Sequence, residues 1–208
     1  MEYNHPSELI KELNFGEDAK SKIIAGVDKL AKAVKSTLGA SGKCVIYEDA
    51  RGNPVITKDG VTVAESVVLY DPVENLGAKL IKEAAQNTVK EAGDGTTTAT
   101  VLAEALIKEV QKEEYKDLSI RFIKNGINSC LEKVNDYLDN TAIEVKGSML
   151  EDVSTISCNN DRYLGMKIAE AYEKVGKDGV VFMENSETDD TYVDIVDGVQ
   201  FDCGITSP

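Results

Sequence analysis

Apolar residues recur every three or four positions along most of this chain, which is the spacing of one buried face of a helix. The first such segment begins near Glu17 and Asp18, whose carboxylates suit a helix N-terminus, and runs to Gly39, which suits a C-terminal cap. Later segments with the same spacing cover about 75–92, 96–112, 117–138 and 161–175. The pattern therefore predicts a mainly helical protein.

Two short apolar stretches early in the chain have the pattern of strands instead. Residues 43–47 and 54–57 lie on either side of a turn-rich cluster at 49–53, which predicts a small β-hairpin. Residues 61–67 fit either a helix or a strand. Because these strands are too few for a doubly wound sheet, we expect a helical domain with an inserted hairpin up to about residue 140.

The composition changes after about residue 140. The stretch 152–160 is polar and rich in turn-forming residues, and 179–184 and 191–196 have the pattern of two further strands, separated from the helical stretch 161–175. We therefore expect a small α/β segment to follow the helical domain.

Length and charge restrict the class of protein. The 208 residues are enough for one large domain or two small ones. The formal net charge is −14, from 23 basic and 37 acidic residues, which argues against nucleic acid as a partner. No apolar stretch approaches the length of a bilayer span and the N-terminus has no signal-peptide pattern, so we expect no membrane partner and a cytoplasmic protein.

The reactive side chains restrict the chemistry. His5 is the only histidine, which nearly excludes histidine bases, catalytic triads and zinc sites. The 4 cysteines are far apart and form no Cys-x-x-Cys pair, so we expect reduced, partly buried thiols. Any catalysis must therefore use carboxylates, lysines, hydroxyls or a bound metal.

The run Gly93-Asp94-Gly95-Thr96-Thr97-Thr98 separates two of the predicted helices. Glycines let a backbone approach a ligand closely, and the free N–H groups at the start of the second helix favour an anion. Asp94 adds a carboxylate suited to Mg²⁺, and the threonines add neutral hydrogen-bonding groups. The same residue types are common at an ordinary helix start, so the run alone leaves both interpretations open.

Two other loops combine a hydroxyl with glycine or aspartate at the end of a predicted element. They are Thr37-Leu38-Gly39, at the end of a helix, and Thr57-Lys58-Asp59-Gly60, at the end of a strand. In their order and spacing, these two loops and the run 93–98 resemble the nucleotide-binding loops of group I chaperonins, the GroEL-type 60-kDa heat-shock protein family. Thr155-Ile156-Ser157 matches a further signature of that family, as does Gly198-Val199-Gln200-Phe201-Asp202.

The resemblance implies an ATP site on these loops. Asp94 would bind Mg²⁺ on the nucleotide phosphates, and Asp59 would be the catalytic carboxylate that positions the attacking water, with a turn aspartate as the alternative for Asp59. The residues that would border or cradle the nucleotide are Thr37, Leu38, Gly39, Lys58, Gly95, Thr96, Thr97, Thr98, Ile156 and Ser157. Thr37, Lys58 and Thr97 would also help to place a monovalent cation such as K⁺.

The resemblance also implies the N-terminal portion of a multidomain, mainly α chaperonin fold. Residues 1–143 would be the first segment of the equatorial domain, 144–196 the first segment of the intermediate domain, and 197–208 the start of the apical domain, with Gly198 at a hinge. The implied function is ATP-dependent refolding of non-native proteins by a homo-oligomeric ring, with a co-chaperonin lid as a further partner.

Some positions depart from the family pattern. Ala40 stands where the family usually has proline, and Cys203 where it usually has arginine, which indicates a divergent member of viral or other unusual lineage, located in the host-cell cytoplasm if viral. A short non-catalytic paralogue or fragment that acts as an interaction protein is the alternative, and the stop at residue 208 favours it. A stand-alone ATPase or kinase is a third hypothesis. The retained Lys58, Asp59 and Asp94 favour the ATP-driven chaperone.

Overall fold

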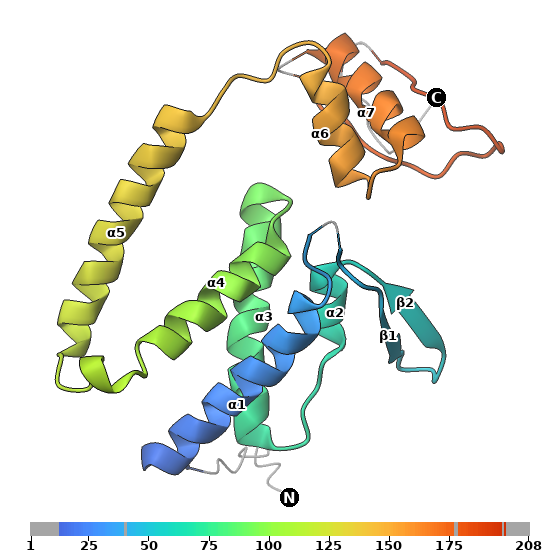
Figure 1. Cartoon of the computed structure of the whole chain (residues 1–208). Coiled ribbons are helices and arrows are strands. Elements are labelled where there is room, and N and C mark those ends of the chain that lie inside the picture. Colours follow the sequence, from blue (N-terminus) through green and yellow to red (C-terminus); the bar gives the residue numbers. More distant parts are fainter. Residues whose placement is uncertain (1–12, 40, 177–178, 197, 199–208) are drawn as a thin grey trace, which may run out of the picture. The chain divides into compact units, whose positions relative to one another are not determined.

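A computed structural model of the chain describes residues 13–39, 41–176, 179–196 and 198 (Figure 1). The elements in chain order are α1 (Gly16–Lys35), β1 (Val45–Glu48), β2 (Pro54–Thr57), α2 (Gly60–Ser66), α3 (Pro72–Ala92), α4 (Thr96–Glu109), a 3₁₀ turn (Glu113–Tyr115), α5 (Ile120–Thr141), α6 (Met149–Ser157) and α7 (Arg162–Val175). The chain divides into two compact units, residues 1–129 and 130–208. The predicted mainly helical fold with one small two-stranded sheet is confirmed.

The core of the first unit lies where α1, α2 and α3 meet. Its buried side chains are Val27, Leu30, Val34, Val63, Ala64, Ala78 and Ile81, and α4 adds the partly buried Ala103 and Ile107. Two glycines allow α1 and α3 to touch through their backbones. A Cβ on Gly26 would lie 1.8 Å from the carbonyl oxygen of Glu74, and one on Gly77 would lie 2.0 Å from that of Ile23. Only glycine fits at such a crossing.

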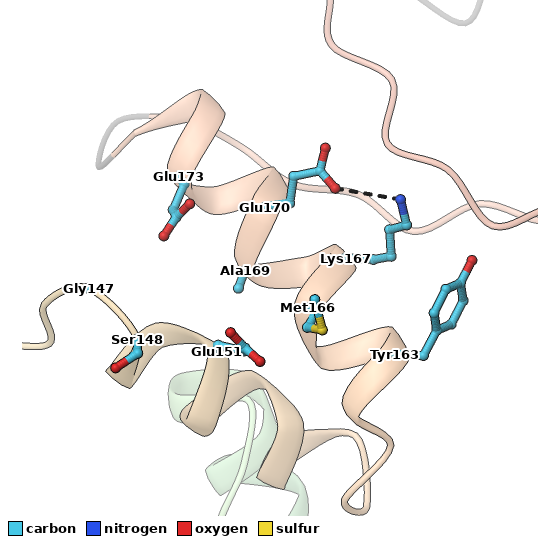
Figure 2. A pocket seen from close by; sticks show the side chains of 9 residues that line it. All are labelled: Gly147, Ser148, Glu151, Tyr163, Met166, Lys167, Ala169, Glu170 and Glu173. Atoms are coloured by element: carbon cyan, nitrogen blue, oxygen red, sulfur yellow. Dashed lines mark ion pairs between the residues drawn. The ribbon is translucent and has the colours of Figure 1, made fainter.

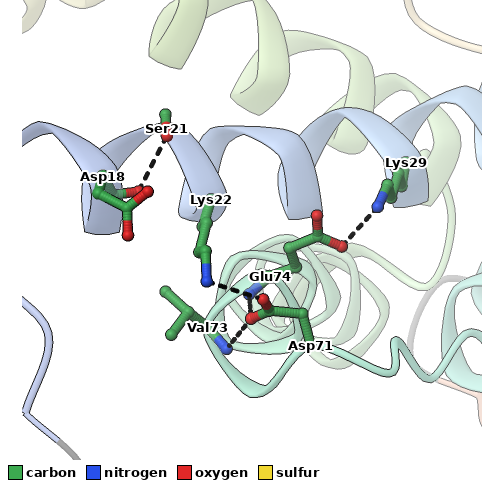
Figure 3. A network of polar contacts seen from close by, with 7 residues as sticks. All are labelled: Asp18, Ser21, Lys22, Lys29, Asp71, Val73 and Glu74. Atoms are coloured by element: carbon green, nitrogen blue, oxygen red, sulfur yellow. Dashed lines mark hydrogen bonds and ion pairs between the residues drawn. The ribbon is translucent and has the colours of Figure 1, made fainter.

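Ion pairs hold the start of α3 against α1 (Figure 3). Lys22 Nζ lies 3.0 Å from Asp71 Oδ2. Lys29 Nζ lies 2.5 Å from Glu74 Oε2. Asp71 is also the N-cap of α3, where its carboxylate accepts hydrogen bonds from the N–H groups of Val73 at 2.8 Å and Glu74 at 3.2 Å. The hydrogen bond from Lys22 and these two N–H groups hold the pKa of Asp71 below its ordinary value.

The hairpin is antiparallel, with Ile46 opposite Ile56. Asp49 closes its turn, because its Oδ1 accepts hydrogen bonds from the N–H groups of Arg51 and Asn53, each at 2.8 Å. The segment 61–67, which the pattern left open, is helical in α2 up to Ser66. The first predicted helix extended too far: α1 ends at Lys35, and Thr37 then donates its N–H to Val34 at 3.0 Å, with the three-residue spacing of a tight turn.

Beyond the end of α5, the described part of the second unit contains the helices α6 and α7. Asp161 caps α7 by accepting a hydrogen bond from Leu164 N–H at 3.1 Å, and Arg162 pairs with Glu151 of α6 at 3.1 Å. Gly165 permits close packing of the two helices, since a Cβ there would lie 2.4 Å from the hydroxyl oxygen of Thr155. The polar, turn-rich interpretation of 152–160 was therefore wrong for residues up to 157, because a short helix needs only a few inward positions and carries little apolar periodicity.

The two strands predicted at 179–184 and 191–196 were also wrong. Both stretches are irregular in the structure. A strand needs a neighbour that accepts and donates its backbone hydrogen bonds, and the described part of the second unit supplies none. Among the described helices, none combines the length and the apolar character needed to cross a bilayer. Apart from Gly198, the predicted apical segment 197–208 lies outside the described residues.

Candidate functional site

Two glycines with left-handed backbone conformations lie between α3 and α4. Gly93, with a φ of +73°, ends α3 by donating its N–H to Val89 at 2.9 Å. Gly95, with a φ of +83°, is the N-cap of α4, and its N–H donates to the Asp94 carboxylate at 2.6 Å. Because glycine brings no side chain, the N–H groups of the first turn of α4 are left without a side-chain cap. Free N–H groups at a helix N-terminus are suited to an anion.

The end of α1 lies beside this helix start. The Thr37 hydroxyl donates to the carbonyl oxygen of Val34 at 2.8 Å, and its oxygen lies 3.4 Å from the Thr97 hydroxyl. Gly39 follows with a φ of +72°, and Lys43 N–H donates to Ser36 at 2.7 Å, which returns the chain toward the helix end. Two hydroxyls from loops sixty residues apart in sequence are thus neighbours.

Asp59 is the N-cap of α2. Its Oδ2 accepts hydrogen bonds from the N–H of Thr62 at 2.8 Å and from the Thr62 hydroxyl at 2.5 Å, and its own N–H donates to Thr57 at 3.0 Å. Partial burial raises the pKa of Asp59, but the hydrogen bonds from Thr62 and from Val61 N–H outweigh it and hold that pKa below its ordinary value. The carboxylate is therefore ionised and fixed in direction at neutral pH.

Gly60 brings this third loop against α4. A Cβ on Gly60 would lie 2.2 Å from the Thr97 hydroxyl oxygen and 3.4 Å from that of Thr96. Thr97 thus touches both the end of α1 and the start of α2. The structure brings together three of the predicted loops, which carry Thr37, Asp59 and the run 93–98.

The donor set fits a nucleotide-bound magnesium ion. No cluster of three His, Cys, Asp or Glu side chains suitable for a metal occurs among the described residues. Mg²⁺ in phosphate-transfer sites commonly takes one or two protein carboxylates and completes its shell with water and substrate phosphates. The exposed Asp94 carboxylate, one residue before the N-cap Gly95 of α4, matches that kind of site.

Other predicted site residues are not gathered by the described contacts. Leu38 and Lys58 are exposed on their loops. Ile156 and Ser157 end α6 in the second unit, where both are exposed. Gly198 has a φ of +115°, which favours glycine, but no contact tests its role as a hinge.

Two hollows of the structure do not coincide with the three loops. One of about 310 Å³ lies between α6 and α7 (Figure 2), where Lys167 approaches Glu170 at 3.6 Å and Glu151 and Glu173 add further carboxylates. An acidic lining of this kind does not suit a phosphate. The other hollow, of about 490 Å³, lies between the hairpin and α2 and contains Glu48 and Glu65.

Sequence reasoning missed Thr62, and it included Gly60 in a predicted loop without foreseeing the contact that Gly60 makes. Thr62 orients the Asp59 carboxylate, and Gly60 permits the contact with Thr97. Asp at an N-cap with a threonine three residues later was a signal that could have identified Thr62. The contact at Gly60 joins segments far apart in sequence, so a single sequence gave no signal for it.

Comparison with known proteins gives a consistent result. Residues 30–208 match the model of the TCP-1/cpn60 chaperonin family. The chain is 44% identical over 203 residues to "Chaperonin GroEL 1" of Rhodopirellula baltica, an alignment that covers 96% of this chain and 36% of that protein. The chain thus spans about a third of the length of this curated relative.

Solved structures show the same likeness. The crystal structure of the chaperonin gp146 from the bacteriophage EL 2 (Pseudomonas aeruginosa), in the presence of ATP-BeFx, matches with a TM-score of 0.67 and 33% identity, covering 76% of this chain and 28% of that one. A group III chaperonin in the open state matches with a TM-score of 0.63 and 27% identity, covering 76% of this chain and 32% of that one.

Proposed function

The chain belongs to the TCP-1/cpn60 chaperonin family, and on that premise we propose that it supplies the ATP site of a chaperone subunit that refolds non-native proteins. ATP binding and hydrolysis would change the relative stability of two conformations of the subunit, because a ligand shifts such an equilibrium by its difference in affinity for the two states and hydrolysis removes the γ-phosphate. The substrate is Mg-ATP, and the reaction is transfer of the γ-phosphoryl group to water.

The observation that carries the proposal is the contact of Thr97 with both Thr37 and Gly60 at the uncapped start of α4. Three loops from distant parts of the sequence meet where backbone N–H groups and the helix dipole favour an anion. A helix start without a ligand would not require contacts from two other loops. The residues that gather are hydroxyls, which suit phosphate, and glycines, which allow close backbone approach. Two aspartates join them, and of these Asp94 suits Mg²⁺ and Asp59 suits the attacking water.

Each residue has a role in this proposal. Bound Mg²⁺ supplies charge neutralisation at the phosphates, and Asp94 would hold it. The main-chain N–H groups and hydroxyls of Gly95, Thr96, Thr97 and Thr98 would bind phosphate oxygens. Asp59, ionised and oriented by Thr62, would accept a hydrogen bond from the attacking water and align it. Leu38, Gly39, Ile156 and Ser157 would complete the nucleotide contacts.

A monovalent cation such as K⁺ would sit near the threonine pair. The hydroxyl oxygens of Thr37 and Thr97, 3.4 Å apart, can both turn a lone pair toward one ion. The ammonium of Lys58 has no acceptor, so Lys58 would contribute its main-chain carbonyl oxygen. The sequence has no Gly-x-x-x-x-Gly-Lys-Ser/Thr motif, whose lysine binds phosphate in many ATPases. The cation would offset phosphate charge in place of that lysine.

The proposed assembly is a homo-oligomeric ring that acts on non-native client proteins, with a co-chaperonin lid as a further partner and the cytoplasm as the compartment. Gly198 would serve as the hinge toward an apical domain. Residues 1–143, 144–196 and 197–208 would be the first equatorial segment, the first intermediate segment and the start of the apical domain.

The test is Mg²⁺-dependent phosphate release from ATP by the natural protein and its Asp94→Ala variant. We expect the variant to lose turnover by at least about a hundredfold, because no other carboxylate in the run replaces the metal ligand. Asp117→Ala is the matched control, since Asp117 is exposed and lies in a turn after α4. Undiminished hydrolysis in Asp94→Ala would refute the assignment of Asp94 as the metal ligand. A parent protein that neither binds nor hydrolyses ATP would favour the alternative of a non-catalytic interaction protein.

A further inference from the structure

A row of polar residues, here called the polar seam, joins α4 to α1 over about three helical turns that begin at the run 93–98. Thr97, Thr100, Glu104 and Lys108 recur at three- and four-residue spacing, so they share one face of α4. Thr97 meets Thr37, Glu104 pairs with Lys35, and Lys108 pairs with Asp28 at 3.0 Å. The two helices therefore run antiparallel along this seam, and the seam begins at the predicted nucleotide loops.

Glu104 is the central residue of the seam. Only 3% of the surface of Glu104 is exposed. Glutamate side chains are rarely buried to this extent without charged or hydrogen-bonding partners. One carboxylate oxygen pairs with Lys35, the last residue of α1, and the other lies 2.8 Å from Lys108. Burial raises the pKa of Glu104, but the hydrogen bonds and charges of Lys108 and Lys35 outweigh it and keep that pKa below its ordinary value.

The position of Lys35 gives this ion pair a link to the site. Lys35 ends α1, and Thr37 follows two residues later in the loop that meets Thr97. Glu104 lies seven residues after Thr97, two turns along α4. A shift of either helix would separate Lys35 from the buried Glu104 carboxylate and leave that carboxylate with Lys108 alone. Such a loss is costly for a carboxylate that is itself buried, although the Lys35 and Lys108 side chains are 41% and 49% exposed. The Lys35–Glu104 ion pair therefore fixes the position of α4 along α1.

We propose that Glu104 is a positioning residue for nucleotide binding, which acts through Lys35 to hold the Thr37 loop against the start of α4. This inference rests on the proposed ATP site. Thr100 supports it, because its buried hydroxyl oxygen has no hydrogen-bond partner among the described residues. Among the described residues, the seam has no further polar contact between Thr97 and Glu104. The Lys108–Asp28 pair lies one turn further along α4, so the Glu104–Lys35 pair is the ion pair of the seam nearest to the Thr37 loop.

The experiment measures Mg-ATP affinity and binding stoichiometry by calorimetry for the natural protein, Glu104→Gln, Lys35→Met and the double variant. Glutamine keeps the shape of Glu104 and removes its charge. We expect each single variant to bind about tenfold more weakly at unchanged stoichiometry, and the double variant to lose no more than either single one, because both remove the same pair. Glu109→Gln is the matched control, since Glu109 pairs with Lys112 on the exposed side of the same helix.

Each other result overturns the inference in a recognisable way. Unchanged affinity in Glu104→Gln would show that the pair does not position the site. Reduced stoichiometry at unchanged affinity would show a role in folding alone, because the folded fraction would still bind normally. Losses that multiply in the double variant, to about a hundredfold, would show that Glu104 does not act through Lys35. A parent protein without affinity for Mg-ATP would instead refute the proposed function itself.

Discussion

Replacing Gly60 by alanine tests the meeting of α2 and α4 directly. The added Cβ would lie 2.2 Å from the Thr97 hydroxyl oxygen, far inside van der Waals contact. Gly60 is buried and begins α2, so the new methyl group cannot turn into solvent. Either Thr97 rotates its hydroxyl away, or the two helix starts move apart.

The magnitudes separate stability from binding. Turning the Thr97 side chain to a less favoured position costs about 0.5–1.5 kcal/mol. Alanine in place of glycine gains about 1 kcal/mol in a helix interior and less at the first residue of a helix, where Gly60 lies. The two effects are of similar size and opposite sign, so the free energy of unfolding should change little. A hydrogen bond from the Thr97 hydroxyl to a charged phosphate is worth about 1.5–3 kcal/mol. Its loss corresponds to a weakening of Mg-ATP binding by about tenfold to a hundredfold.

The assay is calorimetric titration with Mg-ATP together with thermal unfolding of the parent and variant proteins. The control is Gly126→Ala, because Gly126 lies within helix α5 and a Cβ there would meet nothing within 4 Å. We expect the control to bind normally and to be more stable by about 0.5–1 kcal/mol. A Gly60→Ala variant with the parent's affinity would refute the reasoning, because the contact would then have no part in phosphate binding.

Three further results are expected. Gly26→Ala should destabilise the protein by at least about 1–3 kcal/mol in thermal unfolding, because the Cβ meets the backbone of α3 and the helices must separate; an unchanged melting temperature would contradict the packing of α1 on α3. Asp59→Asn keeps an N-cap acceptor, so α2 should fold and nucleotide binding should be retained. Because the variant lacks the carboxylate charge, ATP hydrolysis should slow at least about tenfold in single-turnover kinetics; a loss of affinity alone would place Asp59 in binding. Because the folded-state pKa of Glu104 lies below its ordinary value of 4.5, the stability that Glu104 contributes is present above that pH and lost as pH falls through the folded value. The stability difference between the parent and Glu104→Gln should therefore be constant above about pH 5 and shrink below 4.5; a difference that persists in acid would show that charge is not its cause.

Local signals in the sequence predicted most of the first unit. The three- and four-residue spacing located α1, α3 and α4 to within a few residues, and the turn cluster around Asp49 located the hairpin. These elements depend on side chains close together in sequence. The stretch 179–184 was misassigned because strand formation depends on a distant partner as well as on its own pattern.

The candidate site divides in the same way. The glycine and threonine run at the start of α4 could be recognised in the sequence because the conformations it requires are local. The order and spacing of the loops linked Thr37 and Asp59 to the run through a family resemblance. The contact of Gly60 with Thr97, and that of Lys35 with Glu104, depend on how α1, α2 and α4 pack, which periodicity does not specify.

Native mass spectrometry of the protein from its natural source, with and without Mg-ATP, tests the central claim most directly. We expect an assembly of identical subunits in a closed ring, with added mass that corresponds to bound nucleotide and is absent in the Asp94→Ala variant. A monomer whose mass does not change with Mg-ATP would contradict both the ring and the ATP site.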